Sequence, residues 1–269
     1  MSRSIQTLNP GRMTQNKAML FFRTLILWCL SLTCLQSAWA GQLAVAVASN
    51  FSAPAKQIGR LFEHQTGHRV VMSFGSTGQF HAQIKNGAPF EVFLSADSAT
   101  AAQLEESGLA VAASRFTYAT GKLVLWSPLP GLVDDEGAVL RQQAFQKMAM
   151  ANPKLAPYGS AALETLEKMG LRESLKGRIV EGLNITQAHQ FVASGNVPLG
   201  FVALSQVFEN GRIASGSAWI VPKGMHAPIR QDAVLLKKGM SNPAAQAFLQ
   251  FLRSDEAKTV IRAHGYELE

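Results

Sequence analysis

The segment LAVAVASNFSAPAKQIGRLFEHQ, residues 43–65, contains a short apolar run followed directly by a longer amphipathic one. Residues 43–48 are all apolar and have the length of a strand, whereas the apolar residues of 52–65 recur at helical spacing. Ser52 and Pro54 are typical of the start of a helix, and Gly67 is typical of its end. The segment therefore predicts a buried strand that leads into a helix.

The same order recurs twice in the next forty residues. Apolar runs at 69–73 and 90–96 precede amphipathic runs at 77–86 and 99–107. Repeated strand-then-helix units predict an α/β protein with a mixed, mostly parallel sheet and helices on both faces. The β-rich stretch 116–127 then ends in Pro128, and we expect it to be a strand that crosses into a second lobe.

A second set of alternating runs follows, and it predicts a second sheet of the same type. The expected strands and helices of this lobe are, in chain order, 147–150, 159–169, 178–181, 186–193 and 199–203. The apolar run 229–236 would return to the first lobe, where helices at 243–252 and 254–264 would complete it. Two chain crossings at a hinge would let the cleft between the lobes close. The predicted lobes are residues 41–125 with 229–269, and residues 126–228.

The first forty residues have the pattern of a signal peptide. They contain Arg3, Arg12, Lys17 and Arg23 and no acidic residue, then an apolar run at 24–34, then Ala38-Trp39-Ala40. The apolar run is shorter than the roughly 20 residues that a membrane span needs. Leu32-Thr33 also lacks the small residue that lipoprotein processing at Cys34 prefers. We expect cleavage after Ala40 and export to the periplasm.

Removal of this segment changes the apparent chemistry of the chain. The whole chain has 269 residues, with 25 Lys and Arg against 18 Asp and Glu, and the loss of the four basic residues above lowers the net charge from +7 to +3. Both cysteines, Cys29 and Cys34, are also removed, which excludes disulfides and a thiol nucleophile. Without a block of Lys and Arg, the chain shows no signature of nucleic-acid binding. We expect a soluble monomer.

The sequence contains no motif of a hydrolase or of a metal enzyme. The G-x-S-x-G and H-E-x-x-H motifs are absent, and the turn at 75–78 lacks the lysine of a phosphate-binding P-loop. His64 and His68 are spaced like metal ligands on a helix, but Thr66-Gly67 between them ends the helix. A serine hydrolase using the 75–78 turn would need a base, and His81 lies one helical turn past Thr77. We therefore expect no catalytic residues, no metal and no cofactor.

Small polar residues do recur where expected strands end and helices begin. These segments are Ser49-Asn50, Ser76-Thr77-Gly78, Ala156-Pro157-Tyr158-Gly159 and Asn184-Ile185-Thr186. Ligands of open α/β sheets lie at the carboxyl ends of the strands, and helix N-termini attract anions. Each segment taken alone is explained as a helix N-cap. Four of them, two from each lobe, indicate an anion site in the cleft.

The chain resembles the periplasmic molybdate-binding proteins of ABC transporters over essentially residues 43–266. The resemblance is carried by the order and spacing of several segments, namely ASNF at 48–51, SFGSTG at 73–78, AQI at 82–84, NGAP at 86–89, VFLSAD at 92–97, YATGKLVLW at 118–126, NP at 152–153, APYG at 156–159 and LGFVA at 199–203. It implies a type II periplasmic binding protein fold and a non-enzymatic receptor. Such a receptor delivers a captured oxyanion to a membrane permease.

The resemblance also implies the residues that would hold the oxyanion. They are Ser49 and Asn50 in the first loop, Thr77 or the neighbouring Ser76 in the second, and Tyr158 and the backbone N–H of Ile185 in the second lobe. Some members use a tyrosine hydroxyl at the strand that here reads Gly200-Phe201-Val202-Ala203. Ala203 has no hydroxyl, so this chain resembles the members that take the contact from Tyr158 or from the first loop.

The chemistry of the implied ligand agrees with such a site. Molybdate and tungstate are dianions at neutral pH, so a site for them needs only donors. Such a site should reject a protonated phosphate, and it would exclude sulfate by cavity size. The sequence does not separate molybdate from tungstate. A receptor for another anion, such as sulfate or a small carboxylate, and a secreted serine hydrolase are the alternatives to a molybdate receptor.

Overall fold

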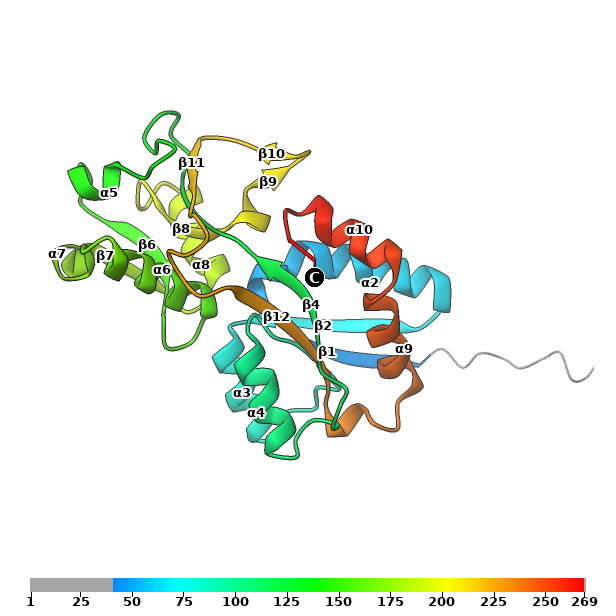
Figure 1. Cartoon of the computed structure of the whole chain (residues 1–269). Coiled ribbons are helices and arrows are strands. Elements are labelled where there is room, and N and C mark those ends of the chain that lie inside the picture. Colours follow the sequence, from blue (N-terminus) through cyan, green and yellow to red (C-terminus); the bar gives the residue numbers. More distant parts are fainter. Residues whose placement is uncertain (1–40, 269) are drawn as a thin grey trace, which may run out of the picture. The chain divides into compact units, whose positions relative to one another are not determined.

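The computed structural model of the chain describes residues 41–268, which contain two five-stranded sheets (Figure 1). The first sheet has the strand order β2-β1-β3-β12-β4. Its strands, in that order, are Arg69–Gly75, Gln42–Ala48, Val92–Leu94, Ile229–Leu235 and Phe116–Gly121. β1 pairs in parallel with β2 and β3, and β12 runs antiparallel to β3 and β4. The sheet is mixed, as predicted.

The second sheet has the strand order β11-β5-β8-β6-β7. Its strands, in that order, are Ser217–Ile220, Leu123–Ser127, Gly200–Ala203, Met148–Ala151 and Ile179–Gly182. β6 is parallel to β7 and β8, whereas β5 is antiparallel to β8 and β11. This sheet is also mixed, with its parallel strands together on one side.

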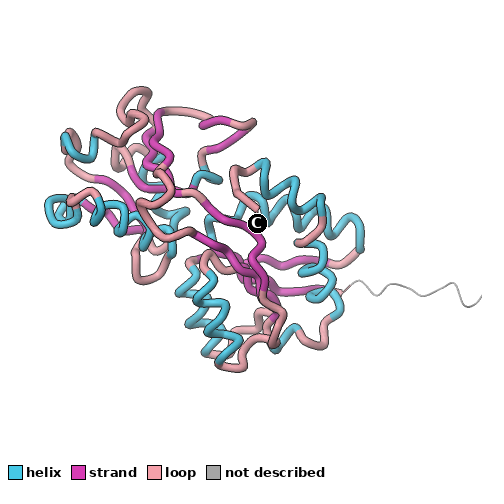
Figure 2. Tube along the Cα trace, viewed as in Figure 1, coloured by secondary structure: helices cyan, strands magenta, loops and turns pink. Residues whose placement is uncertain are grey.

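The stretch 116–127 forms two strands instead of the single strand predicted. β4 ends at Gly121 in the first sheet, and β5 begins at Leu123 in the second. The carbonyl of Lys122 between them accepts a hydrogen bond from the Leu204 N–H at 2.9 Å, so the chain leaves one ladder and joins the other within one residue. β12 returns the chain to the first sheet, which confirms the second crossing (Figure 2). The lobe bounds themselves stay a prediction.

Helices cover both faces of the first sheet (Figure 1). α2 (Ser52–Thr66), α9 (Pro243–Leu252) and α10 (Asp255–Ala263) pack in one core with Val45 and Val47 of β1. α3 (Thr77–Lys85) and α4 (Ser98–Glu106) pack in another core with Ala46. Because successive side chains of a strand point to opposite faces, the continuous apolar run of β1 serves both cores.

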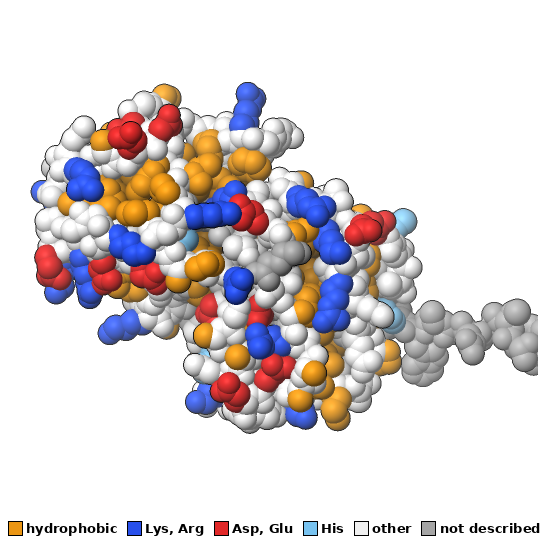
Figure 3. Space-filling model, viewed as in Figure 1, with side chains coloured by type: hydrophobic (Ala, Val, Ile, Leu, Met, Phe, Trp, Pro, Cys, Tyr) orange, Lys and Arg blue, Asp and Glu red, His pale blue; other side chains and the backbone are white. Residues whose placement is uncertain are grey.

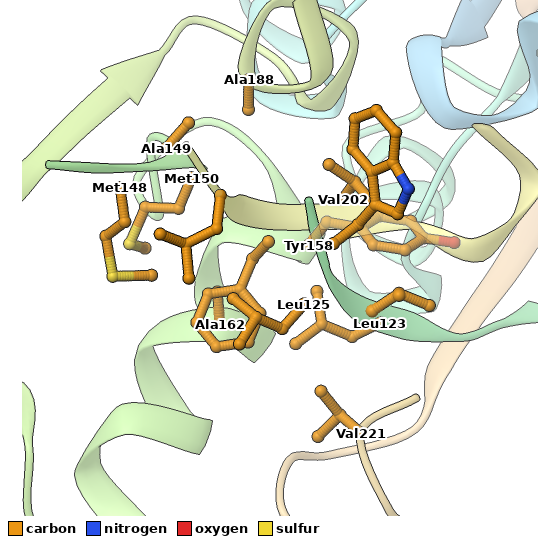
Figure 4. Close-up of a cluster of buried hydrophobic side chains, with 14 of the residues drawn as sticks. Leu123, Leu125, Met148, Ala149, Met150, Tyr158, Ala162, Ala188, Val202 and Val221 are labelled. Atoms are coloured by element: carbon orange, nitrogen blue, oxygen red, sulfur yellow. The ribbon is translucent and has the colours of Figure 1, made fainter. Parts of the chain in front are cut away.

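The second sheet is covered mainly by α6 (Pro157–Lys168) and α8 (Ile185–Ala193). Figure 4 shows Ala188 of α8 and Ala162 of α6 with Ala149 and Met150 of β6 between them. The ring of Tyr158, from the first turn of α6, lies in the same apolar cluster. The first turns of both helices are therefore anchored by the core of this sheet.

Several short elements were not predicted, because they are too short for a hydrophobic period to show. They are the 3₁₀ turns η1 (Ser49–Phe51), η2 (Lys176–Arg178), η3 (Leu204–Gln206) and η4 (Lys237–Gly239), the helices α5 (Val139–Gln142) and α7 (Arg172–Leu175), the hairpin β9 (Phe208–Glu209) with β10 (Arg212–Ile213), and the edge strand β11. η1 and η3 matter for the site, since each follows a strand and carries polar residues.

The predicted signal peptide, residues 1–40, lies outside the described residues. Within residues 41–268, no helix has both the length and the apolar character needed to cross a membrane. Figure 3 shows Lys and Arg side chains interspersed with Asp and Glu over the face in view. That face therefore carries no broad patch of a single charge.

Candidate functional site

The six residues predicted to bind the ligand all lie in buried positions after strands. Ser49 and Asn50 follow β1 in η1, Ser76 and Thr77 follow β2 at the start of α3, Tyr158 lies in the first turn of α6, and Ile185 begins α8. Their exposed fractions are only 2% to 6%. Polar side chains at such positions need partners or a ligand, because an unpaired buried polar group is costly.

The first loop is held by the second lobe through its backbone carbonyls. The Ser49 carbonyl accepts a hydrogen bond from Thr186 Oγ1 at 3.2 Å, and the Asn50 carbonyl accepts one from Ser205 Oγ at 2.8 Å. Thr186 belongs to α8 and Ser205 to η3, so two elements of the second sheet meet η1. The structure thus brings the Ser49-Asn50 loop beside the start of α8.

The second loop separates the roles of its two hydroxyl residues. Ser76 is the N-cap of α3: its Oγ accepts from the Gln79 N–H and donates to Gln79 Oε1 at 2.9 Å, which is a capping box. Thr77 Oγ1 accepts from the Ala96 N–H at 3.0 Å, so the bond uses its oxygen and leaves its own proton to be donated. Thr77 is therefore the better donor of the pair. The Ser76 hydroxyl bonds the Gln79 amide and not His81, the base that a serine hydrolase would need there.

Close backbone contact joins this loop to the second lobe. The Gly78 N–H donates to the Leu155 carbonyl at 2.9 Å. A β-carbon at Gly78 would lie 3.1 Å from that oxygen, which is tighter than ordinary contacts. Thr77, Gly78, Leu155 and Ala156 line one pocket of about 320 Å³. The second loop thus lies beside the segment that leads into Tyr158.

Tyr158 lies with its ring in the second core and its hydroxyl at the junction of the two sheets. The hydroxyl oxygen accepts a hydrogen bond from Gln231 Nε2 at 3.3 Å. Gly121, the last residue of β4, makes room for it, because a β-carbon there would overlap the hydroxyl. Burial, followed by the neighbouring Tyr266 and Tyr118, raises the pKa of Tyr158 well above its usual value. The side chain is therefore a neutral donor at physiological pH.

Ile185 presents its backbone N–H at the start of α8. It is the first residue of α8, and the N-cap Asn184 accepts from the Gln187 N–H at 3.0 Å, which satisfies a different donor of the first turn. The side chain of Ile185 is buried in the second core. The first N–H groups of a helix have no partner within it, so the Ile185 N–H points out of the helix start. At the end of β8 the Ala203 N–H donates to Gln206 Oε1 at 2.9 Å, so that backbone donor is already used.

The electrostatics of the site come from neutral donors and helix N-termini. None of the six predicted residues carries a formal charge. His189, which lines a pocket of about 480 Å³ together with Ser49 and Asn50, has its pKa lowered by burial. Within the described residues, no group of three or more His, Cys, Asp or Glu side chains is arranged to hold a metal ion.

Three residues near the site were missed by the sequence analysis. Gln231 on β12 and the hydroxyls of Tyr118 and Tyr266 connect Asn50 to Tyr158. The polar residues Gln231-Asp232, directly before the apolar residues 233–236, were a visible signal. The chain also has only three tyrosines, and all three are buried around Gln231.

The likeness of this chain to known proteins covers almost its whole length. The model of the family described as bacterial extracellular solute-binding protein matches residues 43–267. The chain is 58% identical over 233 residues to the molybdate-binding protein ModA of Azotobacter vinelandii, covering 87% of this chain and 92% of that protein. It is 52% identical over 230 residues to the protein of the same name from Rhodobacter capsulatus, with coverage of 86% and 90%.

A solved structure shows the same likeness in three dimensions. The periplasmic molybdate-binding protein of Azotobacter vinelandii superposes with a TM-score of 0.82 at 44% sequence identity, covering 84% of this chain and 99% of that one. The fold of this chain therefore has a counterpart among solved structures.

Proposed function

The chain belongs to the bacterial extracellular solute-binding proteins, and on that premise we propose that it captures molybdate between its two sheets and delivers it to an ABC permease. The observation that carries this function is the high identity to two molybdate-binding proteins over nearly their full length. The protein is a transport component, not an enzyme. Its work is done outside the cytoplasm, as the family description implies.

The buried polar residues supply the donors that a tetrahedral dianion requires. The proposed set is the hydroxyls of Ser49, Thr77 and Tyr158 and the backbone N–H groups of Asn50 and Ile185. In this set Ser76 caps α3 and holds Thr77 in place. A hydrogen bond to a charged group contributes roughly 1.5–3 kcal/mol, so several of them offset the burial of the dianion.

The proposed site offers hydrogen-bond donors, and this explains the selectivity that we expect between oxyanions. A fully deprotonated oxyanion presents only acceptors, so every member of this set can donate to it, whereas the O–H of a protonated phosphate would require one of these hydroxyls to accept instead of donate. Sulfate carries the same charge on a smaller ion, so the cavity size must exclude it. Tungstate matches molybdate in charge and shape, and we expect it to bind as well.

The proposal also includes the export of the chain and its partner in the membrane. Residues 1–40 serve as a signal peptide that is removed after Ala40, which places the remaining chain in the periplasm. It acts there as a monomer, without nucleic acid, and its partner is the permease in the membrane.

The proposal is tested by titrating the exported protein with molybdate, tungstate, sulfate and phosphate by calorimetry and by thermal shift. A ligand that binds only the folded state raises the melting temperature. We expect a large rise with molybdate and tungstate and none with the other two. Binding of sulfate or a small carboxylate in preference would assign a different anion, and no binding at all would contradict an oxyanion receptor.

A further inference from the structure

Gln231 lies at the centre of a buried cluster that joins the two lobes. The cluster consists of Gln231, Asn50, Tyr118, Tyr158 and Tyr266, and we call it the tyrosine cluster. Gln231 has no exposed surface. Its Oε1 accepts from Asn50 Nδ2 at 2.8 Å and from the Tyr118 hydroxyl at 3.0 Å, while its Nε2 donates to the Tyr158 oxygen at 3.3 Å.

The orientation of both amides in this cluster follows from where the protons must be. The Tyr266 hydroxyl lies 2.8 Å from the Asn50 carbonyl and donates to it, because a carbonyl only accepts. The Asn50 side-chain atom 3.0 Å from the same hydroxyl must therefore be the donor Nδ2. Since Nδ2 also faces Gln231 at 2.8 Å, the Gln231 atom there is the acceptor Oε1. Nε2 is left to face Tyr158.

This orientation determines what the Tyr158 hydroxyl can do. A phenol has one proton, and because its oxygen accepts from Gln231 Nε2, the proton is directed away from Gln231. Gly121 and the Gln231 amide confine the hydroxyl on the side of β4, where a β-carbon on Gly121 would lie 2.7 Å from Nε2. Figure 4 shows the Tyr158 oxygen at the edge of the apolar cluster that holds its ring. Tyr266 is the other hydrogen-bonding neighbour of this hydroxyl, so the proton is directed to the side on which Tyr266 lies.

A β-bulge brings the second donor to Gln231. β12 pairs Gln231 with Ala119 and the next residue, Asp232, with Thr117, so Tyr118 is the extra residue. In a regular ladder Tyr118 would point to the face opposite to Ala119 and its partner Gln231. Here the Tyr118 hydroxyl instead bonds Gln231, while Thr117 Oγ1 bonds Asp232 at 2.8 Å on the other face. Bulges re-aim side chains in this way next to functional sites.

We propose that Gln231 is the positioning residue of the oxyanion site, which holds the Tyr158 hydroxyl so that its proton points to the bound anion. The inference rests on the proposed function. In this proposal Gln231 acts through Tyr158 rather than by touching the anion, because its Nε2 donates to Tyr158 and also hydrogen-bonds with Tyr266, while its Oε1 accepts from Asn50 and Tyr118. Because Asn50 lies in the first lobe and Tyr158 in the second, this alignment is complete only when the two lobes are together.

The test is a double-mutant cycle with molybdate titrated into the exported protein. Tyr158→Phe should weaken binding by about tenfold to a hundredfold, since one charge-assisted hydrogen bond is lost. Gln231→Met keeps the length of the side chain and removes its hydrogen bonds, and it should weaken binding by at least about fivefold. If Gln231 acts through Tyr158, the double variant binds much more tightly than the product of the two single effects predicts.

Thr117→Val is the matched control, because it deletes one partly buried hydrogen bond of the same strand pair on the opposite face. It should lower stability and combine additively with Tyr158→Phe. Where Gln231→Met does not fold, Gln231→Glu takes its place: it keeps the acceptor for Asn50 and loses the donor to Tyr158. Additive losses in the Gln231 cycle would overturn the positioning role alone. A wild-type protein that binds neither molybdate nor tungstate would overturn the proposed function, and this inference with it.

Discussion

At the scale of single residues, neighbouring hydroxyls of one loop have different tasks. Ser76 and Thr77 are both buried after β2, and sequence reasoning left either of them as the donor. The structure commits the Ser76 proton to Gln79 and uses only the oxygen of Thr77. The difference arises because Ser76 stands at the N-cap of α3, whereas Thr77 is already inside the helix.

This division predicts that substitutions at the two positions separate affinity from stability. Thr77→Val should weaken molybdate binding by about tenfold to a hundredfold, because a charge-assisted bond is lost, whereas Thr77→Ser should keep most of the affinity. Ser76→Ala should instead lower the free energy of unfolding by about 1 kcal/mol, as the loss of a cap does. Calorimetric titration and denaturant unfolding of the three variants measure both quantities. A larger loss of affinity in Ser76→Ala than in Thr77→Val would reverse the assignment.

At the scale of elements, the start of α3 contacts the second lobe through a backbone hydrogen bond. The Gly78 N–H to Leu155 carbonyl bond and the Thr186 bond to the Ser49 carbonyl each join a helix start to a loop of the other lobe. Such contacts need small residues at the point of approach. The close approach of Leu155 therefore explains the glycine at position 78. Its φ does not require glycine, because it is not in the left-handed region.

Gly78→Ala should consequently change affinity and stability in opposite directions. The new β-carbon would lie 3.1 Å from the Leu155 oxygen and would disfavour the contact between the two lobes. Molybdate affinity should therefore fall several-fold, which corresponds to about 1 kcal/mol. Alanine favours a helix over glycine by roughly 0.5–1 kcal/mol, so the ligand-free protein should melt no lower than the wild type. Calorimetry and thermal melts without ligand measure the two effects.

Gly177→Ala serves as the matched control for this comparison. A β-carbon at Gly177 has no neighbour within 4 Å, and the residue lies in η2, far along the chain from the contact with Leu155. Its affinity for molybdate should equal that of the wild type. Equal affinity in Gly78→Ala as well would mean that closure does not bring Gly78 against Leu155.

At the scale of the whole molecule, the three tyrosines make stability depend on alkaline pH. Burial is the first cause that raises the pKa of each, to about 12 for Tyr266 and well above the usual value for Tyr118 and Tyr158. An unfolded tyrosine has a pKa of about 10. The stabilisation linked to these neutral hydroxyls is therefore complete below about pH 10 and is lost as the pH rises through the folded pKa.

An alkaline titration followed by the ultraviolet absorbance of tyrosinate tests this expectation. Near pH 10 the folded protein should show almost no tyrosinate, and the signal should then rise together with the loss of the circular dichroism of the fold. A chain unfolded in denaturant should titrate with all three tyrosines near the ordinary pKa. Half-ionised tyrosine in the folded protein at pH 10 would contradict the buried cluster.

The order of elements could be predicted from the sequence because strand and helix periods are local. The eight predicted strand segments and the long helices appear close to their predicted positions. Among these segments, the prediction was wrong for 116–127, which forms two strands instead of one. The small polar residues at the starts of α3, α6 and α8 were also visible, because capping and turn residues act on their immediate neighbours.

The sequence by itself thus determined the two mixed sheets, the family likeness and the positions of the small polar residues that we propose as donors, since each depends on neighbouring residues or on the order of segments. The tertiary structure alone decided how those donors are oriented. Asn50 meets Tyr266 across 216 positions and Gln231 across 181, and Tyr158 meets Gln231 across 73. No local pattern encodes such pairs, because their hydrogen bonds form only after both sheets have folded and β12 has returned between them.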